Sequence, residues 1–303
     1  MSTAKKSLIF LAITFAFSWG ACWLGYLPGP VRDLLYWMGV ILVPRDPGAI
    51  ANFITLVTMM VGPAIGALVC TFAFEKGHRI DALGLRFRVN LWWLYAWLIP
   101  LAICAAALGF TLLSGRHLVD PAQGVLAMAQ GKVPAEKLAQ LRQLLPILDE
   151  LMFIQVLIGT LINAVAITFT EELGWRGYLH FLWRPSGFWR ASLATGAIWG
   201  VWHAPAIYLY GLNYPDHRLI GIPIFIVFCT LLAPVMTLIR DRAGATWATG
   251  LAHGTINATA GLVSLAVSDP AFPWNGLVGI GGLAALGLAF ALLLLSKPHK
   301  FPL

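Results

Sequence analysis

The chain has 303 residues, of which 59% are hydrophobic and only 11% are charged, whereas a soluble domain carries about 25% charged residues. So few charges cannot cover the surface of a domain of this length, which excludes a water-soluble fold. The net charge of +7 comes from Lys and Arg in short breaks between apolar runs, without a basic stripe interleaved with aromatic residues. We therefore expect these groups to contact membrane lipids and expect no nucleic-acid partner.

About eight apolar runs approach or exceed the roughly 20 residues that a membrane-spanning helix needs. The first is interpreted as a retained signal anchor, and the seventh is the weakest by hydropathy because polar residues interrupt it. The chain is therefore expected to be an all-α, polytopic membrane bundle in a single domain, residues 1–303. The runs lie near Ser7–Leu27, Ile50–Phe74, Leu91–Leu113, Leu151–Trp183, Ala191–Tyr210, Leu219–Ile239, Ala245–Val267 and Leu277–Leu295.

The basic residues set the predicted orientation, because Lys and Arg accumulate in the short loops on the cytoplasmic side of a membrane. Every second break between the runs is basic, so both termini are predicted to be cytoplasmic. The residues in these breaks are Lys5, Lys6, Lys76, Arg79, Arg86, Arg88, Arg184, Arg190, Arg240, Arg242, Lys297 and Lys300.

One long external connection, residues 114–150, separates the third and fourth runs. Within it, Pro134–Leu148 has leucines at helical spacing, which predicts an amphipathic helix. Such a helix would lie on the membrane surface, cap the bundle or guide substrate. The leucines are Leu138, Leu141, Leu144, Leu145 and Leu148.

The four cysteines all fall inside apolar runs and form no C-x-x-C pair. We interpret them as small buried hydrophobic residues, not as disulfide partners or zinc ligands. They are Cys22, Cys70, Cys104 and Cys229.

Polar residues inside three of the runs are the candidates for function, since ionisable groups in a spanning segment are costly and usually face the bundle interior. Glu172 and Arg176 are four residues apart, with the acid first, and are predicted to form an ion pair. Glu171 points about 100° away on an α-helix and has no basic residue four positions away. The remaining candidates are His203 in the fifth run and His253 and Asn257 in the seventh.

The depths of these groups are similar. At 1.5 Å per residue, Glu171 lies roughly 18 Å from Trp183, His203 roughly 20 Å from Arg190, and His253 roughly 16 Å from the basic residue that precedes its run. This agreement predicts that the groups converge on one internal, water-filled cavity that opens toward the cytoplasm.

The chemistry that these residue types favour is amide hydrolysis. Glu171 and His203 would polarise a water molecule, and His253 with Asn257, which share a helix face, would stabilise the oxyanion. The same Glu171, His203 and His253 could instead hold a catalytic zinc ion, so the residues leave both a metal-free site and a zinc site open.

At these residues the chain resembles the CPBP family of intramembrane proteases, which includes type II CAAX prenyl endopeptidases and bacteriocin-processing or immunity relatives. The Glu-Glu-x-x-x-Arg motif is Glu171 to Arg176, the aromatic-x-x-x-His motif is Trp199 and His203, and the His-x-x-x-Asn motif is His253 and Asn257. The resemblance covers about Leu151 to Ala260 (151–260), the predicted catalytic core. Trp199 departs from the family, where Phe is more usual.

The resemblance implies a glutamate-type endopeptidase without a metal cofactor, in which Glu171 and His203 activate water and His253 with Asn257 form the oxyanion hole. Glu172, Arg176 and Trp199 would support the site. The implied substrate is a membrane-associated or lipidated, CAAX-like peptide, and the implied location is the cytoplasmic membrane of a bacterium. A proton-coupled transporter and a non-proteolytic membrane scaffold are the alternatives from other functional classes.

Overall fold

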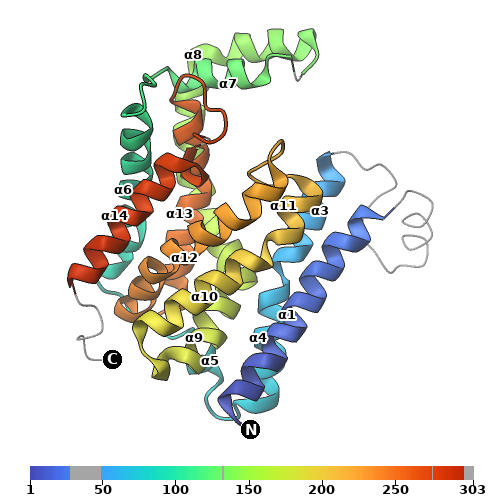
Figure 1. Cartoon of the computed structure of the whole chain (residues 1–303), viewed down its shortest axis with the longest axis vertical. Coiled ribbons are helices and arrows are strands. Elements are labelled where there is room, and N and C mark those ends of the chain that lie inside the picture. Colours follow the sequence, from blue (N-terminus) through green and yellow to red (C-terminus); the bar gives the residue numbers. More distant parts are fainter. Residues whose placement is uncertain (28–48, 132, 275, 297–303) are drawn as a thin grey trace. The chain divides into compact units, whose positions relative to one another are not determined.

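The structure is a computed structural model that describes residues 1–27, 49–131, 133–274 and 276–296. Helices account for nearly all of its regular structure (Figure 1). The α-helices are α1 (Thr3–Tyr26), α3 (Ala49–Met60), α4 (Gly62–Phe74), α5 (Arg79–Leu83), α6 (Trp92–Leu112), α7 (Pro121–Ala129), α8 (Ala135–Ile167), α9 (His180–Trp183), α10 (Phe188–Trp202), α11 (Ala204–Tyr210), α12 (Arg218–Ala243), α13 (Thr246–Leu265) and α14 (Ile280–Ser296). A π-helix, η1 (Thr168–Leu179), and two 3₁₀ turns, η2 (Arg184–Ser186) and η3 (Gly276–Val278), complete the set.

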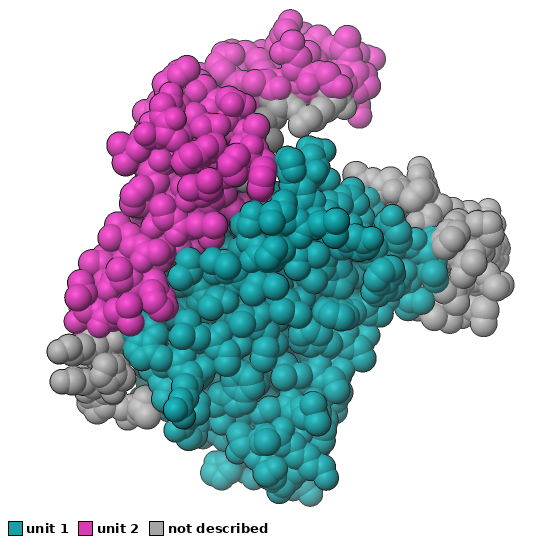
Figure 2. Space-filling view, in the orientation of Figure 1, with its two compact units in different colours: residues 1–88, 167–249, 298–303 teal, residues 89–166, 250–297 magenta. Residues whose placement is uncertain are grey.

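The chain divides into two compact units, which Figure 2 distinguishes by colour. Unit 1 comprises residues 1–88, 167–249 and 298–303, and unit 2 comprises residues 89–166 and 250–297. Each unit is described by itself below. The expectation of one undivided bundle over residues 1–303 stays a prediction, as do the proposed core, 151–260, and the external connection, 114–150.

Unit 1 is built on two close helix pairs, α1 against α4 and α10 against α12 (Figure 1). Ser18 of α1 donates a hydrogen bond of 2.8 Å to the carbonyl of Met59 at the end of α3. Four glycines of unit 1 lie close to a neighbouring segment, because a Cβ atom at any of these positions would meet that segment at 2.8 Å or less. These positions are Gly174 against Pro63, Gly177 against Leu83, Gly196 against Cys229 and Ala233, and Gly200 against Ile226.

Gly200 provides a test of this packing. A Cβ atom there would lie 2.5 Å from the Cα atom of Ile226, so Gly200→Ala forces the α10 and α12 backbones apart. We expect a loss of about 1–3 kcal/mol in the free energy of unfolding. The matched control is Gly109→Ala in α6, where nothing lies within 4 Å of the added atom and a gain of about 0.5–1 kcal/mol is expected. Detergent-titrated unfolding measures both, and equal effects would contradict the packing described.

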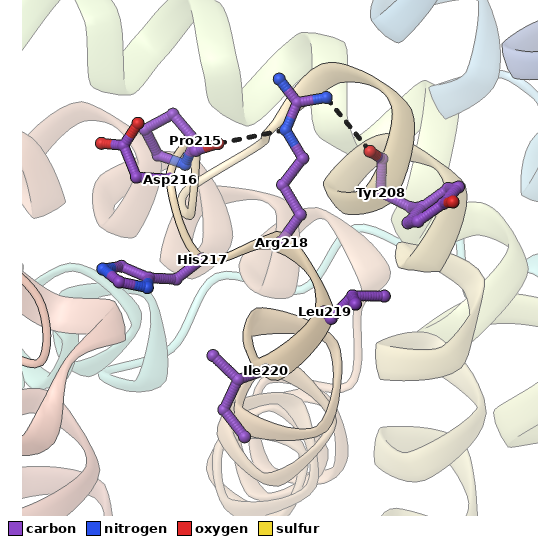
Figure 3. Close-up of a pocket in the computed structure, with 7 residues that line it drawn as sticks. All are labelled: Tyr208, Pro215, Asp216, His217, Arg218, Leu219 and Ile220. Carbon is purple, nitrogen blue, oxygen red and sulfur yellow. Dashed lines mark hydrogen bonds between the residues drawn. The ribbon is translucent and has the colours of Figure 1, made fainter.

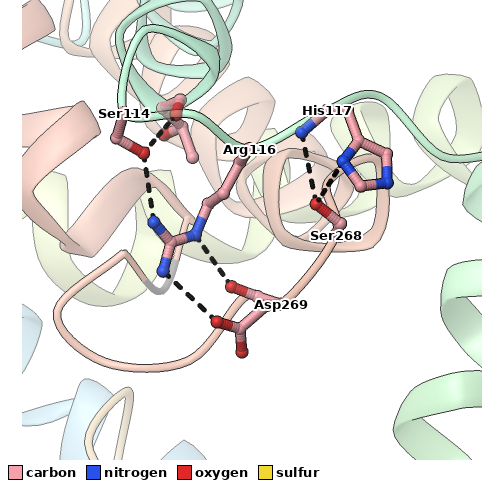
Figure 4. A network of polar contacts seen from close by, with 6 residues as sticks. Ser114, Arg116, His117, Ser268 and Asp269 are labelled. Carbon is pink, nitrogen blue, oxygen red and sulfur yellow. Dashed lines mark hydrogen bonds and ion pairs between the residues drawn. The ribbon is translucent and has the colours of Figure 1, made fainter.

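Unit 2 pairs α6 with α14 (Figure 1). Beyond their ends, an isolated antiparallel β-bridge joins Leu118 to Val267. Figure 4 shows the polar contacts around this bridge, which join the connection after α6 to the one after α13. Arg116 donates from Nε to the Asp269 carbonyl at 2.9 Å and from Nη1 to Ser114 Oγ at 3.1 Å. These contacts fix where α13 ends.

The structure confirms a helical membrane bundle and revises its details. Every predicted run has a helical counterpart, but within the described residues only five segments are long and apolar enough to cross a membrane. The fifth run is two helices, α10 and α11, and the eighth corresponds to α14, a shorter apolar helix. The five segments are Thr3–Tyr26, Asn52–Phe74, Trp92–Leu112, Ala135–Ser186 and Arg218–Ala243.

The helix predicted inside the external connection is longer than predicted. The amphipathic helix predicted over Pro134–Leu148 exists, but it is the beginning of α8 and continues without interruption toward η1. Asp149 and Glu150 end the apolar run without ending the helix. Charged side chains make a segment less suited to an apolar environment, but they leave the backbone hydrogen bonds of the helix intact.

Two further predictions have different outcomes. The four cysteines are free thiols and are buried, which confirms their interpretation as core residues. The cytoplasmic placement of both termini stays a prediction, and Lys297 and Lys300, on which it partly rests, lie outside the described residues.

Candidate active site

The Glu-Glu-x-x-x-Arg segment lies on the π-helix η1, and all of its residues from Glu171 to Leu179 are buried. A π-helix closes its hydrogen bonds between residues i and i+5, is rare, and occurs frequently at functional sites. Its wider turn separates successive side chains by less than the roughly 100° of an α-helix, so Glu171 and Glu172 diverge less than predicted. The carbonyl of Arg176 accepts a 2.9 Å hydrogen bond from Arg240 Nε of α12, which ties η1 to α12 within unit 1.

The predicted ion pair between Glu172 and Arg176 is present. Arg176 Nη1 lies 3.0 Å from Glu172 Oε1, and the two side chains are 1% and 0% exposed. The guanidinium also lies over the indole of Trp199, with Cζ 4.3 Å from the ring centroid. Breaking a charge pair that is so deeply buried is costly, because removal of either side chain leaves the charge of the other buried and uncompensated.

His203 lies at the break between α10 and α11. Its backbone N–H bonds to the carbonyl of Gly200 at 3.1 Å, a tighter turn than an α-helix makes, so the Trp199 carbonyl is left for another donor. The His203 ring takes that place, with Nδ1 2.8 Å from the Trp199 oxygen. A carbonyl can only accept, so Nδ1 carries the proton and Nε2 of the neutral ring is the basic nitrogen.

Glu171 has a partner that the sequence did not predict. The indole Nε1 of Trp199 donates a 2.8 Å hydrogen bond to Glu171 Oε2, and both residues are buried. This partner lies on α10, 28 residues along the chain from Glu171. Trp199 therefore contacts the carboxylate through its side chain and the imidazole of His203 through its backbone.

His253 and Asn257 both lie on α13, in the part that belongs to unit 2. His253 is 6% exposed, whereas the Asn257 side chain is exposed. Gly254 lies close to α8, since a Cβ atom there would approach the backbone nitrogen of Ala164 to 2.5 Å. His253 and Asn257, four residues apart on α13, therefore belong to unit 2, whereas Glu171 and His203 belong to unit 1.

A search for metal-binding clusters gives no group of three or more His, Cys, Asp or Glu side chains among the residues that the structure describes. Sequence analysis had left Glu171, His203 and His253 open as zinc ligands. Carboxylate and imidazole are donors that zinc accepts, so the donor types fit zinc and the choice of mechanism rests on experiment.

A surface pocket of about 510 Å³ lies between α11 and the beginning of α12. Figure 3 shows Arg218 turned toward α11, where its Nη1 donates to the carbonyl of Tyr208 at 3.2 Å. The same nitrogen donates to the carbonyl of Leu209 at 2.9 Å. Arg218 thus satisfies carbonyls that the helix end leaves without an intrahelical donor. The pocket contains none of the predicted site residues.

Comparison with known protein families gives a match over part of the chain. Residues 146–259 match the family model described as type II CAAX prenyl endopeptidase Rce1-like. A search of curated proteins gives no significant match. The apolar helices and this match define an intramembrane endopeptidase. This segment is similar to the CAAX protease family, and all seven predicted site residues lie inside the matched range.

Proposed function

We propose that this protein hydrolyses a peptide bond in a lipidated, CAAX-like substrate, using water activated by Glu171 and His203. The observation that carries the proposal is the connection of both groups to one residue. Trp199 bonds to Glu171 Oε2 and to His203 Nδ1, each at 2.8 Å. A carboxylate and an imidazole with a basic Nε2 are thereby held near each other in a buried setting, as general-base catalysis requires.

In the proposed reaction the water oxygen attacks the carbonyl carbon of the scissile bond as its proton passes to Glu171. The resulting tetrahedral intermediate carries a negative oxygen. Transfer of that proton from Glu171 to the amide nitrogen then breaks the C–N bond and releases an amine and a carboxylic acid, whose proton passes to the amine or to water. His203 Nε2 accepts a hydrogen bond from the water and orients its lone pair toward the carbonyl.

The oxyanion needs donors, and we assign these to His253 and Asn257. The assignment is supported by their four-residue spacing on α13 and by the resemblance to the His-x-x-x-Asn motif. An imidazole N–H and a side-chain amide both donate, and each such donor is worth about 10²–10³-fold in kcat.

We propose a metal-free form of this mechanism and retain zinc as the alternative. If zinc were bound by Glu171, His203 and His253, it would supply an activated water. The same residues would then be ligands and not proton acceptors, so a chelator separates the two forms of the mechanism.

The proposed substrate carries a prenyl group or another lipid near the scissile bond, and membrane lipids surround the protein. The family description supports a prenylated CAAX substrate, and the apolar spans support a substrate that reaches the enzyme through the membrane. We further propose that the site opens toward the cytoplasmic side and that the protein resides in the cytoplasmic membrane of a bacterium.

A matched pair of peptides tests the substrate class. Both end in the same CAAX sequence, and only one is prenylated on its cysteine. With purified protein in liposomes we expect the prenylated peptide to be cleaved at least about tenfold faster, since burial of each lipid CH₂ favours membrane binding by about 0.8 kcal/mol. Mass spectrometry of the products locates the broken bond. Equal cleavage of the two peptides would contradict the requirement for a lipid, and cleavage of neither would favour a non-proteolytic scaffold.

A further inference from the structure

Position 199 is where this chain departs from the motif that it otherwise matches, since Phe is the more usual residue there. We propose that Trp199 is a positioning residue of the reaction: its indole N–H orients the Glu171 carboxylate while its backbone carbonyl orients the His203 ring. The inference rests on the proposed function of Glu171 and His203. A phenylalanine could fill the same space, but it has no group that could bond to the carboxylate.

The contact with Glu171 has the geometry of a strong hydrogen bond. The Nε1 to Oε2 distance of 2.8 Å lies in the range of bonds to an ionised acceptor, which are about twice as strong as neutral ones. Trp199 is 2% exposed and Glu171 is 3% exposed, so water competes little for either group. One carboxylate oxygen is thereby fixed, and the orientation of the other follows from it.

The contact with His203 requires the local backbone of α10. Trp199 precedes His203 by four residues, the distance at which an α-helix would pair the Trp199 carbonyl with the His203 N–H. That N–H instead bonds to Gly200, and the ring Nδ1 bonds to the Trp199 carbonyl at 2.8 Å. Because of the tighter turn at the end of α10, the Trp199 carbonyl accepts a hydrogen bond from the His203 ring and not from the His203 backbone N–H.

The face of the Trp199 indole packs against the side chain of Arg176. The guanidinium of Arg176 lies 4.3 Å from the ring centroid, and Arg176 is fixed by its ion pair with Glu172. The motif's second Glu and its Arg, which the sequence predicts as an ion pair that supports the site, therefore hold the residue that orients the first Glu. A supporting group has to be rigid to hold a reacting group within a fraction of an ångström.

The substitution Trp199→Phe removes the N–H and keeps an aromatic ring and the backbone carbonyl. The matched control is Trp175→Phe, because Trp175 is also fully buried but its Nε1 has no hydrogen-bond partner. We expect kcat to fall by about 10–100-fold in Trp199→Phe, with KM within about twofold of wild type, because a misplaced catalytic group costs rate and not affinity. We expect kcat of Trp175→Phe to stay within about threefold of wild type. Equal kcat values in the two variants would overturn the proposal.

A spectroscopic measurement tests the same bond without requiring turnover. The indole N–H proton of Trp199, assigned by its loss in Trp199→Phe, should resonate downfield in the ¹⁵N-labelled protein and move upfield in Glu171→Gln, whose neutral oxygen is a weaker acceptor. A resonance that does not respond to Glu171→Gln would overturn the positioning role, whatever the activity. If the response is present while wild type cleaves no peptide, the proposed function fails and the hydrogen bond stands.

Discussion

The Glu171→Gln protein is expected to fold normally and to lose peptide cleavage, with kcat reduced by about 10²–10⁴-fold. Glutamine has the shape of glutamate and can still accept the hydrogen bond from Trp199, which in the wild type measures 2.8 Å. What it cannot do is accept the proton of an attacking water. Initial rates on a prenylated peptide, together with the unfolding midpoint of each protein, measure the two effects separately.

A second buried carboxylate serves as the control for this variant. Glu75 is 7% exposed, bonds to Lys6 Nζ at 2.6 Å and accepts from the Tyr178 hydroxyl at 3.3 Å. Glu75→Gln breaks an ion pair outside the proposed site, so we expect lower stability with cleavage retained. Loss of cleavage in both variants would mean that neutralising any buried carboxylate of unit 1 inactivates the protein, which would contradict a specific role for Glu171.

Breaking the ion pair of Arg176 should have the largest effect on stability. Its partner Glu172 is fully buried, so Arg176→Met leaves a carboxylate without its compensating charge. We expect a loss of about 3–5 kcal/mol in the free energy of unfolding. Detergent-titrated unfolding of the purified protein measures this loss.

The double variant Glu172→Leu with Arg176→Met separates charge from packing. Two apolar side chains of similar size leave no charge unpaired, so we expect the double variant to recover most of the stability lost in Arg176→Met. Cleavage should remain impaired, because the indole of Trp199 loses the guanidinium that lies over it. A double variant less stable than Arg176→Met would contradict the role given to the buried charge.

An exposed ion pair provides the comparison. Arg86 Nη2 bonds to Asp81 Oδ2 at 3.0 Å, and the side chains are 59% and 39% exposed. Arg86→Met should therefore change stability far less than Arg176→Met. The Arg86 hydrogen bond lowers the pKa of the Asp81 carboxyl, so the small contribution of this pair is present above the ordinary pKa of Asp and is lost as pH falls through the lowered value.

The positions of the helices were predictable because each run must satisfy its backbone within an apolar solvent. Hydropathy does not report where such a helix breaks or how it is wound. The division at His203 depends on a local turn ahead of Pro205, and the π-helix η1 depends on tertiary packing at Gly174 and Gly177. Hydropathy also does not predict the continuity of α8, because Asp149 and Glu150 end the apolar run whereas the helix continues through them.

The candidate site was predictable as a set of costly polar groups but not as a network. The four-residue spacing of Glu172 and Arg176 predicted their ion pair, because both partners lie on one element. The bond between Trp199 and Glu171 joins residues 28 positions apart on different helices. Spacing along one sequence carries no signal for such a contact. The signal that the sequence offers is Trp199 itself, which stands where Phe is more usual in the family that the chain resembles.

The central claim, metal-free peptide hydrolysis by Glu171, is tested most directly by one assay. Purified wild type and Glu171→Gln are each incubated with a prenylated CAAX peptide in liposomes, with and without a strong chelator, and the products are identified by mass spectrometry. We expect wild type to cleave equally in both conditions and Glu171→Gln to cleave in neither. Cleavage by wild type that disappears with the chelator and returns with added zinc would contradict the metal-free mechanism, and full cleavage by Glu171→Gln would contradict the role of Glu171.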